Sequence, residues 1–366
     1  MTEQFGEHLL VSFKVEDHLL DRLRSDSRFA SVEYYPSNYV EGTKHPGAFW
    51  HHEPPEVPKK VLEKTTIQMT MFYVPAEAES VPNLRFIQGM SAGVEHLLPA
   101  LAPLMKSHPD LKIASASGVH ATTIAEYCIM NLLSLFHRQS VLRDIQAQQK
   151  WNRTMYIPPG QLGGCSELRG KRLGVLGYGC IGREVARLAS AFGMSVAAST
   201  SGGTRTLAKG YTIQGTGDPD GALPVSWSKS TDGAQFEQFL RDCDVLVISC
   251  PSTPATKHLI NRKTLGYLSS DVVLVNVARG SVIDHDALLD ALEGDKLAGA
   301  VLDVTDPEPL PPNHPLWQAR NCVVTPHIAG GGHLYTTRCV DLLSINVDRL
   351  SRGEAAMNAV DAQKGY

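Results

Sequence analysis

One short stretch constrains the fold more than any other: residues 173–182, which read Leu-Gly-Val-Leu-Gly-Tyr-Gly-Cys-Ile-Gly. An apolar strand is followed by Gly177, Gly179 and Gly182 at G-x-G-x-x-G spacing, and then by apolar residues at a helical period. In a dinucleotide-binding turn the first glycine permits the bend, the second lets backbone approach a pyrophosphate, and the third allows close helix–strand packing. The helix N-terminus then offers N–H groups to the anion. The spacing alone is weak, but its strand and helix context favours a dinucleotide site over a structural glycine turn.

The end of the next predicted strand, residues 194–199, bears on the choice of coenzyme. An Asp or Glu there would hold the ribose 2′-OH of NAD, but the strand ends at Thr200, with Ser201 and Arg205 after it. Hydroxyls and a guanidinium, with no carboxylate to repel a 2′-phosphate, favour NADP(H), while NAD(H) stays possible. The alternative is an ordinary polar loop with Arg205 directed to solvent.

Composition limits the remaining classes of function. A chain of 366 residues, 43% hydrophobic and 20% charged, suggests two globular domains. The net charge of −4 without a basic run argues against nucleic acid or an anionic membrane as partner. No apolar stretch is long enough to span a bilayer or to act as a signal sequence. The seven scattered cysteines lack metal-ligand spacing, so we expect a cytoplasmic protein with reduced thiols and no metal site.

The first hundred or so residues alternate strand and helix signals, which predicts a parallel, doubly wound sheet. This block has no phosphate loop, so it is the candidate substrate domain. We therefore expect an α/β protein with two doubly wound parallel-sheet domains, one Rossmann and one flavodoxin-like, and a cleft between them. Residues 1–118 and 333–366 would form the substrate domain, and residues 119–332 the NAD(P)-binding domain.

Two further segments carry structural predictions. Residues 121–150 read as one long helix whose first half is apolar on nearly every face, and such a helix must be buried on all sides. Burial between domains or between subunits would satisfy this, so we predict a homodimer through this helix. Residues 201–232 are rich in Gly, Ser, Thr and Asp and read as a long surface excursion.

Polar groups follow three late predicted strands, where a doubly wound sheet binds its ligands. Arg279 follows residues 274–277, Glu308 lies in the loop after residues 301–302, and His327 follows residues 323–325. A guanidinium can hold a carboxylate, an imidazole can exchange a proton with a carbonyl oxygen, and a carboxylate can orient the imidazole. Each residue alone has a structural explanation, but together they favour reversible hydride transfer to a 2-keto acid. Asp303 could hold the nicotinamide carboxamide or merely cap the following turn.

At this point the chain resembles the D-isomer-specific 2-hydroxyacid dehydrogenases, from about Asn83 onward. The resemblance rests on several motifs in order: the glycine turn, then residues 251–256 (PSTPAT), 275–280 (VNVARG), 302–311 (LDVTDPEPLP) and 325–330 (TPHIAG). Within that family the chain is most similar to the glyoxylate/hydroxypyruvate reductase branch. A tryptophan placed like Trp151 can reach a partner's active site in that branch.

The resemblance implies that Arg279, Glu308 and His327 are catalytic. It implies that Ser91, Ala92 and Gly93, together with Arg279, bind the substrate carboxylate. It also implies that Thr122, residues 277–279 and Asp303 contact the nicotinamide half of the coenzyme. Together with the glycine turn and the end of the second strand, we expect coenzyme contacts at Thr122, Gly177, Gly179, Cys180, Ile181, Gly182, Thr200, Ser201, Arg205, Cys250, Pro251, Val277, Ala278, Asp303 and Gly330.

The expected activity is that of an NADPH-linked oxidoreductase (EC 1.1.1.-) acting on a small 2-keto or D-2-hydroxy acid. The alternative is a nucleotide-sensing scaffold that keeps this fold for protein binding, as corepressor relatives do. The set of Arg279, Glu308 and His327 argues against the scaffold, because a sensor needs no proton donor.

Overall fold

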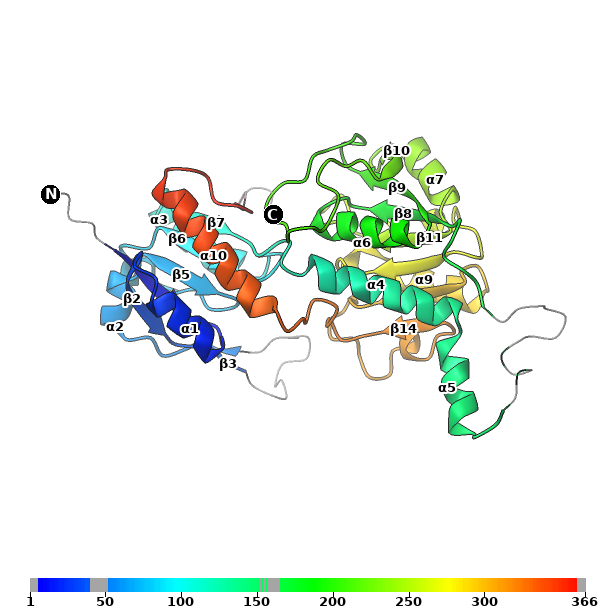
Figure 1. The fold of residues 1–366 in the computed structure, drawn as a ribbon, viewed down its shortest axis with the longest axis horizontal. Helices are drawn as coiled ribbons and strands as arrows, with labels where there is room; N and C mark the ends of the chain where they lie inside the picture. Colours follow the sequence, from blue (N-terminus) through cyan, green and yellow to red (C-terminus); the bar gives the residue numbers. More distant parts are fainter. Residues whose placement is uncertain (1–5, 40–51, 152, 154–155, 157–164, 361–366) are drawn as a thin grey trace. The chain divides into compact units, whose positions relative to one another are not determined.

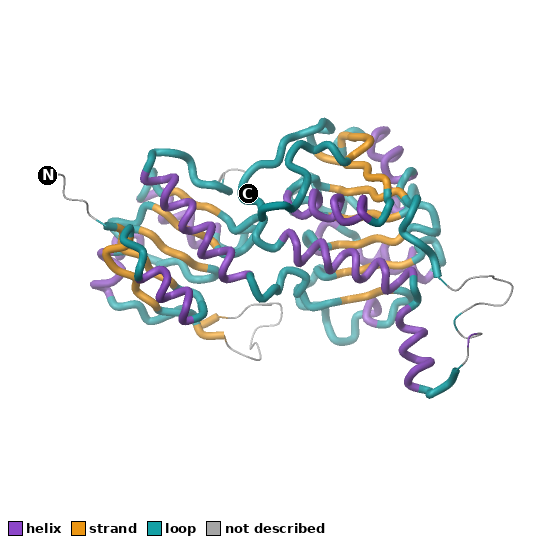
Figure 2. The backbone as a smooth tube through the Cα atoms, viewed as in Figure 1, coloured by secondary structure: helices purple, strands orange, loops and turns teal. Residues whose placement is uncertain are grey.

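The computed structural model describes residues 6–39, 52–151, 153, 156 and 165–360. The chain divides into two compact units, one of residues 1–120 and 332–366 and the other of residues 121–331. In each unit a sheet lies between helices (Figure 2). All strands of the five-stranded and the seven-stranded sheet run parallel. This confirms the predicted α/β class with two parallel sheets.

The first unit has the strand order β2-β1-β5-β6-β7, which is the 2-1-3-4-5 order of flavodoxin-like sheets once a small hairpin is set aside. Its strands are β1 (Glu7–Val11), β2 (Phe29–Tyr34), β5 (Ile67–Thr70), β6 (Phe86–Gly89) and β7 (Lys112–Ala114), and the hairpin is β3 (Asn38–Tyr39) with β4 (His52–Glu53). Its helices are α1 (Asp17–Arg24), α2 (Lys59–Lys64), α3 (Leu98–Ser107) and α10 (Tyr335–Ser351), with a short 3-10 turn at Ala78–Ser80.

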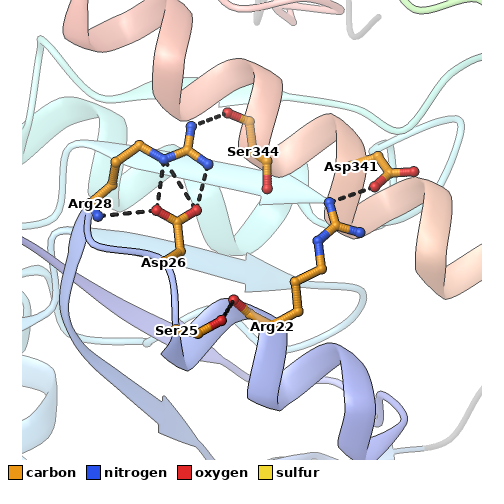
Figure 3. A network of polar contacts seen from close by, with 6 residues as sticks. All are labelled: Arg22, Ser25, Asp26, Arg28, Asp341 and Ser344. Atoms are coloured by element: carbon orange, nitrogen blue, oxygen red, sulfur yellow. Dashed lines mark hydrogen bonds and ion pairs between the residues drawn. The ribbon is translucent and has the colours of Figure 1, made fainter.

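Helix α10 returns from the C-terminal part of the chain and lies beside α1 across this sheet (Figure 1). Polar contacts fix it there (Figure 3). The Arg28 guanidinium donates to the Asp26 carboxylate at 2.9 Å and to the Ser344 carbonyl at 2.7 Å, and Arg22 pairs with Asp341 at 2.6 Å. The hydrogen bond from Arg28 lowers the pKa of Asp26. Side chains from both ends of the chain therefore stabilise one unit.

The second unit has the strand order β10-β9-β8-β11-β12-β13-β14, the Rossmann order 3-2-1-4-5-6 with one strand added. Its strands are β8 (Arg172–Leu176), β9 (Ser195–Thr200), β10 (Pro224–Lys229), β11 (Val245–Ile248), β12 (Val273–Asn276), β13 (Gly299–Leu302) and β14 (Cys322–Val324). Its helices are α4 (Ala121–Phe136), α5 (Gln139–Ala147), α6 (Cys180–Ala191), α7 (Gly233–Arg241), α8 (Arg262–Leu265) and α9 (His285–Glu293), with 3-10 turns at Gly280–Val282 and Pro315–Trp317.

Each face of the seven-stranded sheet has its own apolar core. Helices α4 and α6 pack over one face, and α7 and α9 over the other. The chain reverses its direction of travel across the sheet between β8 and β11, which are neighbours. In open parallel sheets, ligands bind beyond the carboxyl ends of the strands at such a switch point.

The single helix predicted for residues 121–150 is wrong. It is broken into α4 and α5 at Arg138, whose φ of 50° is left-handed. Helix α5 has no buried residue, so no core packing keeps it in line with α4. Helix α4 is also not covered on all sides within the chain, because Met130 is 54% exposed. Among the described residues, no helix combines the length and the apolar character needed to cross a bilayer.

The prediction that residues 201–232 form only a surface excursion is also wrong in part. Their last third contains β10, which pairs with β9 at the edge of the sheet. The strand has an alternating Val-Ser-Trp-Ser run, but the Gly, Ser, Thr and Asp around it favoured a loop. It is held by pairing and by Trp227, whose ring packs edge-on against Tyr178 with 5.1 Å between centroids.

Candidate active site

The glycine turn between β8 and α6 is packed as a dinucleotide turn requires. Gly177 has a φ of 93°, and a Cβ there would lie 2.6 Å from the backbone of Cys250. A Cβ on Gly182 would lie 2.4 Å from the Gly177 carbonyl oxygen and 2.8 Å from Val175. Both positions exclude any side chain for reasons of packing inside the protein.

Gly179 differs from these two glycines. It is the N-cap of the twelve-residue helix α6, and a Cβ on it would meet no heavy atom within 4 Å. No side chain caps the helix at this position. The turn therefore presents open space against the positive end of a helix, which fits the pyrophosphate of a dinucleotide.

At the end of β9 the structure has hydroxyl groups and no acid. The Thr200 hydroxyl oxygen accepts the N–H of Gly203 at 3.0 Å, which closes a turn after the strand. Ser201 is exposed. Arg205 is exposed as well, and its Nε donates to the carbonyl oxygen of Asp220 at 2.7 Å. The Arg205 side chain is thus held by the excursion and is not simply directed to solvent.

The first part of the excursion is anchored to the glycine turn by buried charged residues that the sequence analysis missed. The Tyr178 hydroxyl donates to the Asp218 carboxylate at 2.8 Å, and Arg183 donates to the Asp218 carbonyl at 2.6 Å. Glu184 accepts the N–H of Gly217 at 2.6 Å. Burial opposes ionisation of Asp218, but hydrogen bonds from backbone N–H groups and from Tyr178 outweigh it and lower the pKa. Arg183 and Glu184 are 3% and 1% exposed, so α6 buries charges on a face that faces this loop.

Arg279 follows β12 in a loop whose shape depends on a buried asparagine. Asn276 is fully buried; its side-chain oxygen accepts the Ala278 N–H and its amide donates to the Arg279 carbonyl, both at 3.0 Å. The next residue, Gly280, lies so close to Thr305 that a Cβ would sit 1.9 Å from the Thr305 carbonyl carbon. The Arg279 loop therefore packs directly on the loop of residues 304–310, which we call the acidic loop.

Asp303, at the end of β13, holds the turn that carries His327. Its carboxylate accepts the Thr325 hydroxyl at 2.6 Å and the N–H groups of Ile328 and Ala329 at 2.9 Å, and the residue is 3% exposed. The Thr325 hydroxyl in turn lies 2.6 Å from that of Tyr127 on α4. Asp303 therefore holds the turn of His327 and not the turn that directly follows it in sequence, and a contact with the nicotinamide carboxamide stays a prediction.

Glu308 and His327 come together at this edge of the sheet. The Glu308 Oε1 lies 2.6 Å from the His327 Nδ1, and the two side chains are 24% and 34% exposed. His327 has a left-handed φ of 54°, a conformation that costs backbone energy. Because β12, β13 and β14 are adjacent and parallel, the loops that carry Arg279, Glu308 and His327 all leave the same edge.

A second histidine, missed in the sequence, supports the acidic loop. His285 at the start of α9 is 7% exposed, and its Nδ1 lies 2.9 Å from the Asp306 carbonyl oxygen. Burial lowers the pKa of His285. A lone histidine at the first position of a helix gave no signal in the sequence, because only the fold brings it to the loop.

The other predicted site residues lie as follows. Cys250 and Pro251 follow β11, with the Cys250 backbone against Gly177, and Val277 and Ala278 lie buried after β12. Thr122 is in the first turn of α4, Cys180 and Ile181 are in the first turn of α6, and Gly330 follows the His327 turn. Ser91, Ala92 and Gly93 belong to the first unit, where the Ser91 hydroxyl donates to the Gly93 carbonyl at 2.6 Å.

Comparison with known proteins gives a consistent answer. Residues 129–218 and 221–329 match the family described as D-isomer specific 2-hydroxyacid dehydrogenase, NAD binding domain. The chain is 30% identical to a glyoxylate reductase of Thermofilum pendens over 281 residues (75% of this chain, 74% of that protein). It is 32% identical to the human glyoxylate reductase/hydroxypyruvate reductase over 267 residues (72% and 73%).

Solved structures share the whole fold. A D-isomer specific 2-hydroxyacid dehydrogenase family protein of Aeromonas salmonicida superposes with a TM-score of 0.72 at 24% identity, over 98% of this chain and 99% of that one. The TT0316 protein of Thermus thermophilus gives a TM-score of 0.67 at 29% identity, over 96% and 99%. These matches confirm the resemblance seen in the motifs. The chain therefore belongs to the D-isomer specific 2-hydroxyacid dehydrogenase family and is an NAD(P)-dependent oxidoreductase of 2-hydroxy acids.

Proposed function

We propose that this enzyme reduces a small 2-keto acid of the glyoxylate or hydroxypyruvate type, with NADPH as its preferred coenzyme. The observation that carries the proposal is the 2.6 Å contact of Glu308 with His327 at the strand edge that also carries the Arg279 loop. The names of the relatives at about 30% identity support glyoxylate and hydroxypyruvate as the first substrates to test.

In the proposed reaction each of the three residues has its own role. The planar Arg279 guanidinium binds the substrate carboxylate and polarises the adjacent carbonyl. His327 gives a proton from Nε2 to the carbonyl oxygen as it becomes a hydroxyl, and takes it back in the reverse direction. Glu308 accepts the Nδ1 proton of His327, which orients the ring and stabilises its positive charge. The nicotinamide, when bound, supplies the hydride.

Other residues are proposed to bind the substrate carboxylate and the pyrophosphate and ribose of the coenzyme. The resemblance to the family implies that the backbone amides of Ser91, Ala92 and Gly93 hold the substrate carboxylate. The open space at Gly179 takes the pyrophosphate. Thr200, Ser201 and Arg205 surround the ribose, where the absence of an acid favours a 2′-phosphate.

The test is coenzyme oxidation with a panel of 2-keto acids, from glyoxylate and hydroxypyruvate to branched and aromatic side chains, with NADPH and with NADH. We expect turnover of the small acids with NADPH, lost by about 10²–10⁴-fold in His327→Ala. His18→Ala, a substitution at an exposed position of α1, is the matched control and should keep full activity. Tight NADPH binding without turnover of any acid would instead favour the nucleotide-sensing scaffold.

We further propose that the active form is a homodimer through residues 121–150. The large apolar side chains of Met130 and Leu142 are 54% and 39% exposed, and Trp151 just beyond is fully exposed. Met130 and Leu142 line a groove of about 720 Å³, together with Ile129, Leu133, Leu188 and Phe192. A second copy of the same surface would cover these groups. Met130→Lys should yield a monomer in sedimentation experiments, and a wild-type protein that sediments as a monomer would refute the proposal.

A further inference from the structure

Lys229 lies at the last position of the edge strand β10, next to the predicted coenzyme ribose site. In the parallel ladder it is the register partner of Thr200, and Trp227 is the partner of Ala198. Side chains two residues apart share a face of a sheet, so Lys229 stands on the same face as Trp227. Trp227 packs against Tyr178 of the glycine turn. Lys229 is therefore on the face of the sheet that carries the glycine turn and α6.

The chain after Thr200 folds directly across Lys229. Gly203 donates its N–H to the Thr200 hydroxyl at 3.0 Å and has a left-handed φ of 69°. A Cβ on Gly203 would lie only 2.7 Å from the Cβ of Lys229. The turn of residues 200–203 and the base of the Lys229 side chain thus occupy one corner at the carboxyl ends of β9 and β10.

Two basic side chains, Lys229 and Arg205, lie near this corner, together with Asp220, whose carbonyl oxygen accepts the Arg205 Nε. Residues 200–205 contain no acid, and Lys229 is exposed. The acid that follows closely in sequence, Asp232, is engaged by the α7 cap, where its carboxylate accepts the N–H groups of Ala234 and Gln235 at 3.1 Å. Its charge is thus already directed to the start of a helix.

We infer that Lys229 binds the 2′-phosphate of NADP(H) and is the main determinant of coenzyme preference. This inference rests on the proposed use of NADPH. The ribose that follows the pyrophosphate lies beyond the end of β9, where Thr200 stands in place of an acid. An ammonium group beside Thr200 offers a charge-assisted hydrogen bond to a phosphate dianion and little to the 2′-OH of NAD(H). Arg205, whose Nε is held by the Asp220 carbonyl, is then a secondary contact.

The experiment is equilibrium binding, by calorimetry, of adenosine 2′,5′-bisphosphate and of 5′-AMP to the wild type and to Lys229→Gln. Loss of a charge-assisted hydrogen bond should weaken binding of the bisphosphate by about tenfold or more and leave 5′-AMP unchanged. Lys229→Arg should keep most of the affinity because it keeps the charge. Lys296→Gln, an exposed lysine before the amino end of β13, is the matched control for net charge and should bind both ligands as the wild type does. In parallel, KM for NADPH should rise in Lys229→Gln while KM for NADH stays constant.

A failure of the Lys229 inference and a failure of the proposed NADPH preference would give different results. A wild type that binds both ligands equally would refute NADPH preference itself. A wild type that prefers the bisphosphate, with an unchanged preference in Lys229→Gln, would overturn the role of Lys229 alone. Equal loss of both ligands in Lys229→Gln would also overturn it, because it would indicate a purely structural effect. Arg205→Gln measured beside it should have the smaller effect, and the reverse order would assign the phosphate to Arg205.

Discussion

The three glycines of the turn make a sharp prediction, because they look alike in sequence and differ in their surroundings. Gly179→Ala adds a methyl group that meets no heavy atom of the protein within 4 Å. The backbone angles of Gly179, φ −85° and ψ −163°, are open to alanine. The free energy of unfolding without coenzyme should therefore stay within about 0.5 kcal/mol of the wild type.

The same methyl group lies in the space that we assign to the coenzyme pyrophosphate. Forcing a methyl group into a filled site costs about 1–3 kcal/mol. Since about 1.4 kcal/mol corresponds to a tenfold change, NADPH binding should weaken by roughly ten- to a hundredfold. Gly182→Ala is the matched contrast: its Cβ would overlap the Gly177 carbonyl oxygen at 2.4 Å, so it should destabilise the fold itself.

The assay is denaturant unfolding of both variants without coenzyme, followed by titration with NADPH monitored by fluorescence. We expect Gly179→Ala to unfold like the wild type and to bind poorly, and Gly182→Ala to unfold at lower denaturant. If Gly179→Ala binds NADPH with wild-type affinity, the pyrophosphate does not lie at this turn. If it is as unstable as Gly182→Ala, our account of the open space is wrong.

Three other predictions concern contacts within one or the other of the two units. Thr325→Val removes the hydroxyl that donates to Asp303 at 2.6 Å, and it should lower the free energy of unfolding by about 1.5–3 kcal/mol, with faster amide exchange in the following turn. His285→Leu should lower kcat and leave KM unchanged in steady-state assays, because it removes the ring nitrogen that supports the acidic loop; the Asn variant should restore part of the rate, and full activity of the Leu variant would contradict this. Arg28 lowers the pKa of Asp26, so the stability that Arg28→Met loses is present at neutral pH and disappears below about pH 4; an unfolding difference that grows on acidification would reverse this sign.

Several features of the fold and site were predictable because local chemistry dictates them. Only glycine fits at positions 177 and 182 of the turn, since backbone atoms fill the space that a side chain would need. The parallel, doubly wound sheets follow from alternating strands and helices, whereas their two different strand orders do not. The sequence predicted that His327 and Glu308 lie close together, and in the structure they are 2.6 Å apart. Both follow strands that are neighbours in the sheet. Their catalytic roles stay predictions.

The features that were missed depend on partners far away in sequence. Nothing in residues 121–150 signals the break at Arg138, since it arises where α5 finds no core to pack on. Strand β10 lies at the edge of the sheet within a segment rich in Gly, Ser and Asp, and it is stabilised by its pairing with β9 and by Trp227. The buried pair Arg183 and Glu184 reads as an exposed helix face, and only the returning chain at residues 206–218 explains why it is buried.

Buried polar side chains at the ends of two strands explain how this edge of the sheet can hold reactive groups. Two adjacent strands end in buried polar side chains, Asn276 and Asp303, and the Asp303 N–H donates to the Asn276 carbonyl at 3.1 Å. Each side chain directs its hydrogen bonds to the next turn, Asn276 to the Arg279 backbone and Asp303 to the turn of His327. A buried polar group left without such partners costs about 1–3 kcal/mol, so these turns have little freedom to adopt another shape. The left-handed backbone of His327 persists for this reason: the hydrogen bonds to Asp303 offset its strain, and the imidazole is held in place before any ligand arrives.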